Sequence, residues 1–302
     1  PVDLLDPDDC ARALSSLSDV THIFYAARTP DPDFATEAEL NLRLLRNLIE
    51  AVEPVAPGLA HVNVVHGTKW YGCQIGPFKT PSLEDDPRQL RPCFYYDQQD
   101  YLSDRQKGKS WSWSTLRPPL VCGFSSGYPH NLLTSIALYA SVCRELGQPL
   151  RFPGSQACYD TLYQAVDATL LAKAMAWAAT TPGCANQPFN ITNGDTYRWV
   201  HLWPQIARFF DMEIGPPQEI SLRETMPRLS SVWEGIVDRH QLKDYRYEDL
   251  GNWKFADLIF SLGWDDISST VKSRQCGFAE VEDTTMMFLR LLEQLRGARV
   301  IP

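Results

Sequence analysis

The first half of the chain alternates short apolar segments with stretches whose apolar residues recur at helical spacing. Val20–Ala27 is an apolar run rich in β-forming residues, and His61–Val65 and Ser112–Leu116 are two further runs of strand length. Residues 36–52 carry leucines on one helical face, and Thr36–Glu39 matches the pattern of a helix-capping box. Strands that alternate with helices predict βαβ units and a parallel sheet.

The second half has a different pattern. Asn131–Leu146 and Ala165–Ala179 have the periodicity of helices, and Phe189–Thr192 predicts one more strand. From Trp199 onward the pattern is mainly helical and rich in aromatic residues. This composition predicts a smaller helical domain packed over the carboxyl ends of the parallel strands, where ligands of open α/β sheets bind.

We therefore expect an α/β protein with a Rossmann-type, doubly wound parallel sheet and a smaller, mainly helical C-terminal substrate domain. The dinucleotide-binding domain is placed in residues 1–150, with residues 186–195 returning to it as a strand. The substrate-binding domain is placed in residues 151–302.

The beginning of the chain suggests that an N-terminal portion is missing. Val2–Leu5 has the composition of a strand, and the residues after it have the pattern of a helix cap. The sequence contains no glycine-rich phosphate loop placed directly after a strand. A βαβ unit takes about 30 residues, so we expect at least one such unit to precede Pro1.

Charge and composition exclude several classes of function. The formal net charge is −9, which argues against tracking of a nucleic-acid backbone. The eight cysteines form no C-x-x-C pair and no metal-ligand spacing with histidine, so we expect reduced thiols, no metal site and a cytoplasmic protein. No apolar run approaches the roughly 20 residues that span a bilayer.

Two residues could carry chemistry together. Lys69 follows the strand His61–Val65, at the edge where ligands of parallel sheets bind. Tyr95 stands at the start of a helix expected over Tyr95–Arg105, and a nearby cation would lower its pKa and make it a proton donor or oxyanion stabiliser. Tyr96 and Tyr101 would serve as well on chemistry alone. No tyrosine lies four residues before a lysine here, so spacing does not choose among the three tyrosines. Residue types and spacing therefore leave the active site unresolved.

A serine nucleophile is the main competing hypothesis. Gly123–Gly127 matches G-x-S-x-G literally. A nucleophile elbow requires a strand before the motif and a helix directly after it. Here Arg117-Pro118-Pro119 precedes the motif and Tyr128-Pro129-His130 follows it, which disfavours this hypothesis.

Several segments together resemble the progesterone 5β-reductase / iridoid synthase (PRISE) family, an atypical branch of the short-chain dehydrogenases/reductases. The similarity extends over essentially the whole chain. The segments that carry it are DVTHIFY at 19–25, GTKWY at 67–71, GPF at 76–78, EDDPR at 84–88, FYYD at 94–97, WSTLRP at 113–118, GFS at 123–125, NITNGD at 190–195, Trp199, Trp203 and the terminal VIP.

The resemblance selects Lys69 and Tyr95 as the catalytic pair, supplied from separate segments instead of from Tyr-x-x-x-Lys. It implies reduction of an activated C=C bond by NADPH, with hydride added to the β-carbon of an enone or enal and Tyr95 stabilising the enolate. Trp70 is a departure, since the family usually has histidine there, and we expect it to reshape the pocket wall.

The same resemblance implies further binding residues. Asp3, Leu4, Pro118, Val121 and Ser125 join Lys69 and Tyr95 as expected cofactor contacts. Trp70, Tyr96 and Phe255 are expected to line the site of a small apolar enone-type substrate.

Two other functions remain open at this point. One is carbonyl reduction or epimerisation by the same fold and cofactor, and the other is a non-catalytic or pericyclase-like role. We expect neither a nucleic-acid partner nor a membrane partner. A homodimer is compatible with the sequence, which leaves the oligomeric state open.

Overall fold

The computed structural model describes residues 2–89, 92–125 and 131–302, which divide into two compact units. The first unit contains residues 1–119, 171–191 and 268–279, and the second contains residues 120–170, 192–267 and 280–302. The expected boundary at residue 150 does not coincide with this division into units. The helix before that boundary, α4 (Leu132–Glu145), belongs to the second unit because its buried face packs in that unit's core.

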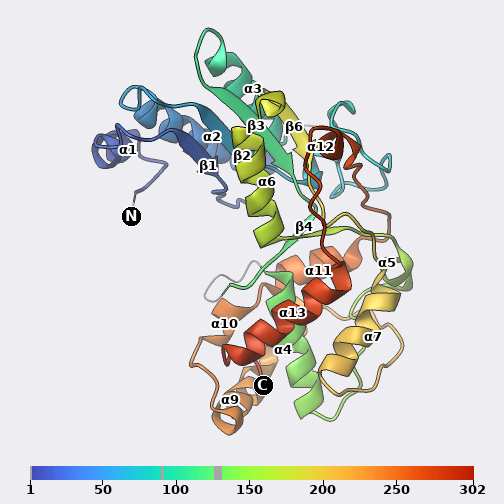
Figure 1. The fold of residues 1–302 in the computed structure, drawn as a ribbon. Coiled ribbons are helices and arrows are strands. Elements are labelled where there is room, and N and C mark those ends of the chain that lie inside the picture. The colour runs from blue at the N-terminus through green and yellow to red at the C-terminus, as the bar shows by residue number, and fades with distance from the viewer. Residues whose placement is uncertain (1, 90–91, 126–130) are drawn as a thin grey trace. The chain divides into compact units, whose positions relative to one another are not determined.

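The first unit is built on a four-stranded parallel sheet with the order β1-β2-β3-β6 (Figure 1). Its strands are β1 (His22–Tyr25), β2 (His61–Val65), β3 (Ser112–Arg117) and β6 (Gln187–Asn190). Its helical elements are α1 (Pro7–Leu14), α2 (Phe34–Val52), η1 (Thr68–Tyr71), α3 (Phe94–Gln106), η2 (Pro182–Cys184), α12 (Val271–Gln275) and most of α6 (Ala168–Thr180). The four predicted strands and the parallel sheet are confirmed.

One face of this sheet is covered by α2 and α3. Side chains alternate between the faces of a strand, and Val62, Val64 and Trp113 share a buried apolar cluster with Leu45 and Ile49 of α2. The predicted helix is confirmed, but its cap is not the Thr36–Glu39 box. The helix begins two residues earlier, with the Asp33 side chain accepting the backbone N–H of Thr36.

The opposite face is covered by α6. Phe189 on β6 is paired in register with Leu116 on β3, so both point away from the Trp113 side. Trp177 of α6 packs edge-on against Phe189, with 4.9 Å between ring centroids. Helices therefore lie on both faces of the sheet, as a doubly wound Rossmann fold requires.

Two sequence predictions about local structure are wrong. Val2–Leu5 is not a strand but a turn before α1, because the Asp3 side chain accepts the backbone N–H of Leu5 and Asp6 caps α1. Residues 165–167 do not begin a helix. They form β5 (Ala165–Asp167), which pairs with β4 (Leu120–Cys122), and the Asp167 side chain accepts backbone N–H groups at the start of α6.

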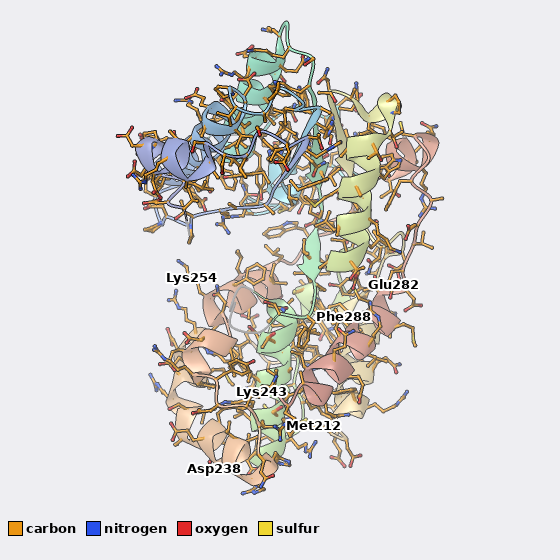
Figure 2. The ribbon with its side chains drawn as sticks, turned by 60° about the vertical axis from the view of Figure 1, so that its left-hand side comes forward. Met212, Asp238, Lys243, Lys254, Glu282 and Phe288 are labelled. Carbon is orange, nitrogen blue, oxygen red and sulfur yellow. The ribbon has the colours of Figure 1, made fainter. Side chains whose placement is uncertain are left out.

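The second unit is mainly helical, as predicted. Besides the β4–β5 pair it contains α4, α5 (Gln156–Asp160), α7 (Trp199–Phe209), α8 (Leu222–Thr225), η3 (Met226–Leu229), α9 (Ser230–His240), α10 (Tyr247–Leu250), α11 (Trp253–Ser261) and α13 (Thr284–Gly297). Its core is aromatic: Trp199 packs against Trp203, Phe260 and Phe288. Figure 2 shows Phe288 among these helices, while Lys254 projects outward from α11.

Helix α13 depends on a side-chain cap that can be tested. Asp283 accepts the backbone N–H of Met286 at 2.8 Å, and the helix buries Phe288, Leu291 and Leu292. We expect Asp283→Ala to lower the free energy of unfolding by about 1 kcal/mol, because an N-cap acceptor is lost. Chemical denaturation measures the change. Asp283→Asn retains an acceptor and should stay close to wild type, and equal losses in both variants would contradict the capping role.

All eight cysteines are free thiols, and five of them are buried. Within the described ranges, no helix has both the length and the apolar character needed to cross a bilayer.

Candidate active site

Lys69 lies in the tight turn that follows β2. The strand ends at Val65, and after His66 and Gly67 the chain forms the short helix η1. The backbone N–H of Trp70 donates to the carbonyl of Gly67 at 3.0 Å, and the N–H of Gly72 donates to the carbonyl of Lys69 at 3.2 Å. Gly72 has a φ of 88°, a conformation that favours glycine. This turn fixes Lys69, half-buried, at the carboxyl edge of the sheet.

Tyr95 reaches the same edge from α3. It is the second residue of that helix, which begins after Cys93. A Cβ placed on Gly67 would lie 3.1 Å from the Tyr95 hydroxyl oxygen and 3.4 Å from the carbonyl oxygen of Pro118. Gly67 is two residues before Lys69, so the turn after β2, the start of α3 and the end of β3 converge at one point.

Lys69 and Tyr95 also share one electrostatic environment. The same four groups affect the pKa of both side chains, namely Arg28, Glu37, Cys73 and Cys93. Burial lowers the pKa of Lys69, and Arg28 lowers it further, whereas Glu37 raises it. Lys69 and Tyr95, which the family resemblance selected, therefore lie within reach of the same four groups at the carboxyl edge of the sheet.

The pKa of Tyr95 differs from the sequence expectation. A nearby cation was expected to lower it, and Arg28 does act in that direction. Burial has the larger effect and raises the pKa of Tyr95 above its ordinary value. Tyr95 is thus held as a neutral phenol, which is the hydrogen-bond donor form.

Arg28, which the sequence analysis did not select, acts electrostatically on both Lys69 and Tyr95. It follows β1 by three residues and forms an ion pair with Glu37 on α2, with 2.5 Å between Nη2 and Oε1. Asn41 holds the same loop, since its side chain donates to the Thr29 carbonyl and accepts the Thr29 N–H. The position of Arg28 in the sequence indicates the same edge of the sheet, because Arg28 follows a parallel strand just as Lys69 does.

Trp70 and Tyr96 are buried near the carboxyl edge of the sheet and do not lie on an open surface. Trp70 is 3% exposed and Tyr96 is 0% exposed. The Tyr96 hydroxyl donates to the Trp70 carbonyl at 2.6 Å and accepts the Gln89 N–H at 2.8 Å. Both side chains are therefore packed inside the first unit, and their contact with a substrate stays a prediction.

The other predicted binding residues are spread over both units. Pro118 is at the site, as its distance to the Gly67 position shows. Val121 is partly exposed on β4, and Ser125 lies between β4 and α4, both in the second unit. Phe255 also belongs to the second unit, where it packs on the helical core from α11.

Asp3 and Leu4 belong to the first unit, at the N-terminal turn. Asp3 holds that turn through its own backbone and side-chain hydrogen bonds, and Leu4 packs on the cluster beneath α2. Of the serine motif, Ser126 and Gly127 lie outside the described residues.

Comparisons with known proteins identify the relatives of this chain. The family described as PRISE-like Rossmann-fold domain matches residues 8–302. A 3-oxo-Delta(4,5)-steroid 5-beta-reductase from Arabidopsis thaliana is 35% identical over 313 residues, covering 99% of this chain and 79% of the relative. An (S)-8-oxocitronellyl enol synthase from Antirrhinum majus is 34% identical over 311 residues, with the same coverage.

Solved structures agree in fold. RMD from Pseudomonas aeruginosa, complexed with NADPH, has a TM-score of 0.67 at 15% identity and covers 97% of this chain and 86% of that chain. A UDP-glucose 4-epimerase from Thermotoga maritima has a TM-score of 0.67 at 16% identity, covering 98% and 83%. The family match and the relatives confirm the predicted family resemblance and the prediction that the chain is an oxidoreductase enzyme. The solved structures agree with the predicted Rossmann fold.

Proposed function

Because the chain belongs to the family of PRISE-like Rossmann-fold domains, we propose that it is an NADPH-dependent reductase of the C=C bond of small apolar enones or enals. The observation that carries the proposal is the approach of the Tyr95 hydroxyl to Gly67, in the turn that carries Lys69 at the carboxyl edge of the sheet. A relative named as a steroid 5-beta-reductase and another named as an enol synthase support this reaction class.

Tyr95 acts on the carbonyl oxygen of the substrate. Its neutral hydroxyl donates a hydrogen bond to that oxygen, and this bond strengthens as the enolate forms. Lys69 supports the negative charge and orients the phenol. Solvent supplies the proton that completes the saturated carbonyl product at the α-carbon.

The residues present fit the nicotinamide end of a dinucleotide. Gly67 has no side chain, and the space that a Cβ would fill is bounded by the Tyr95 hydroxyl and the Pro118 carbonyl. Lys69, Tyr95 and Pro118 of the first unit would hold this end. Val121 and Ser125, and Asp3 and Leu4 beside the adenine, stay predictions of the family resemblance. When bound, the reduced nicotinamide supplies the hydride. Within the described residues we assign none to the diphosphate.

The proposed activity is tested by NADPH oxidation with 2-cyclohexen-1-one and NMR analysis of the product. We expect loss of NADPH absorbance and formation of the saturated ketone, at a higher kcat/KM than with NADH. An allylic alcohol would indicate carbonyl reduction instead. The absence of turnover by folded protein, on this substrate and on a panel of enals, would refute the proposal.

Gly67 provides a sharper test of the geometry. In Gly67→Ala the new methyl group would press on the Tyr95 hydroxyl, which it meets at 3.1 Å. We expect kcat to fall about tenfold or more, because a displaced catalytic group is costly, with little change in melting temperature. Gly76→Ala is the matched control, since a Cβ at Gly76 meets nothing within 4 Å. Equal kcat values for the two variants would contradict the placement of Tyr95.

A further inference from the structure

A column of three side chains supports Tyr95 from behind. The Arg117 guanidinium lies over the Trp70 ring, with 3.6 Å between Cζ and the ring centroid. The Trp70 ring stacks on His66 at 5.8 Å and an interplanar angle of 15°. His66 in turn stacks on Tyr95 at 4.7 Å and 28°. Arg117, Trp70 and His66, which we call the ring column, thus run from a buried cation to the catalytic phenol.

His66 contributes to the column through ring contact. The side chain is 4% exposed, and neither ring nitrogen has a hydrogen bond of normal geometry within the described residues. Burial lowers the pKa of His66 well below its ordinary value, and the charges of Arg117 and Arg88 lower it further. The side chain of Gln98 raises this pKa, with a smaller effect than burial. The imidazole is therefore neutral and presents a flat surface to Tyr95.

A second aromatic side chain also contacts the Tyr95 ring. Phe94 meets the Tyr95 ring edge-on, with 4.4 Å between centroids. The hydroxyl lies beside Gly67, where a Cβ would approach it to 3.1 Å. A phenol ring confined between His66 and Phe94 retains little freedom to move its hydroxyl away from the reacting oxygen.

We propose that His66, backed by Trp70 and Arg117, is a positioning residue that fixes the plane of the Tyr95 ring and keeps its hydroxyl beside Gly67. The role rests on the proposed function, because Tyr95 is the donor in that reaction. It also explains the presence of Trp70, whose broad indole spans the distance between the cation and His66.

Steady-state kinetics of three variants test the proposal. His66→Phe keeps a flat ring, His66→Leu keeps the volume without the ring, and His66→Ala leaves a cavity. We expect His66→Phe to stay within about threefold of wild-type kcat, and the other two to lose about 10- to 100-fold. KM for NADPH should change little in all three. Wild-type kcat in His66→Leu would overturn the proposal, and this variant suffices if His66→Ala does not fold.

A spectroscopic measurement tests the positioning of Tyr95 without relying on catalytic activity. In protein labelled with 3-fluorotyrosine, the ¹⁹F resonance of Tyr95 is the one that Tyr95→Phe removes. We expect one narrow Tyr95 resonance in wild type and His66→Phe, and a shifted, broadened one in His66→Leu. An unchanged resonance in His66→Leu would overturn the proposal. If wild type lacks reductase activity, the proposed function fails while this measurement still tests His66.

The pH profile distinguishes positioning from proton transfer. Among the residues that the structure describes, Arg117 on β3, Arg88 before α3 and Tyr95 are the charged or titratable groups recorded against His66. Since the imidazole stays neutral, wild type and His66→Phe should show the same kcat profile between about pH 5 and pH 9. An acid limb in wild type that His66→Phe lacks would make His66 a proton donor and overturn the positioning role.

Discussion

Replacing Tyr95 by phenylalanine is expected to lower kcat for enone reduction by about 10²- to 10³-fold. The variant removes the hydroxyl that donates to the forming enolate oxygen. It keeps the ring, so the stacking on His66 and the edge contact with Phe94 are retained. KM for NADPH and the melting temperature should therefore remain close to those of wild type.

Tyr101→Phe is the matched control. Tyr101 lies on the same helix, and its buried hydroxyl has no hydrogen-bond partner within the described part of the chain. Its removal should leave kcat unchanged. Lys69→Met should also lose activity, and the double variant Lys69→Met/Tyr95→Phe should be little worse than Tyr95→Phe, because groups that act as a unit are not additive. A Tyr95→Phe variant within about threefold of wild type would remove Tyr95 from the mechanism.

Hydrophobic patterning predicted the elements that carry the site. The predicted strand His61–Val65 has the bounds of β2, and the helix expected at Tyr95 begins one residue earlier. Patterning could not choose among the tyrosines. Neighbouring helical residues point about 100° apart, so Tyr95 faces His66 while Tyr96 turns inward to the Trp70 carbonyl. That difference depends on where α3 docks, which no local pattern contains.

The remaining errors have the same physical origin. The Asp33 cap and the turn at Asp3 are made by polar side chains that bond nearby backbone groups, and several residues could have done so. Residues 165–167 became a strand only because β4 lies beside them. The direction of the Tyr95 pKa shift was missed because burial, which decides it, is a tertiary property.

Replacing Arg117 by alanine is expected to destabilise the fold by about 3–5 kcal/mol, because several buried hydrogen-bond acceptors lose their donor and a large buried side chain is removed. Arg117 is 0% exposed. One terminal nitrogen donates to the Tyr71 hydroxyl and to the Glu84 carbonyl, each at 3.0 Å, and the other donates to Gln99 at 3.1 Å. The Arg117→Ala variant leaves these acceptors without their donor and opens a cavity under Trp70. It also removes one of the cations that favour the charged form of the Glu84 side chain, whose pKa burial raises.

Chemical denaturation with alanine and lysine variants measures this contribution. Arg117→Lys keeps the charge but not the planar guanidinium that donates to Tyr71 and Gln99 together. It should therefore recover only part of the free energy of unfolding that Arg117→Ala loses. Arg246→Ala is the control, because that arginine pairs with Glu248 on the surface and its removal should leave stability unchanged. Since Arg117 also ends the ring column, Arg117→Lys should broaden the Tyr95 resonance even where the protein stays folded. An Arg117→Ala variant as stable as Arg246→Ala would show that the buried cation does not hold this edge of the sheet together.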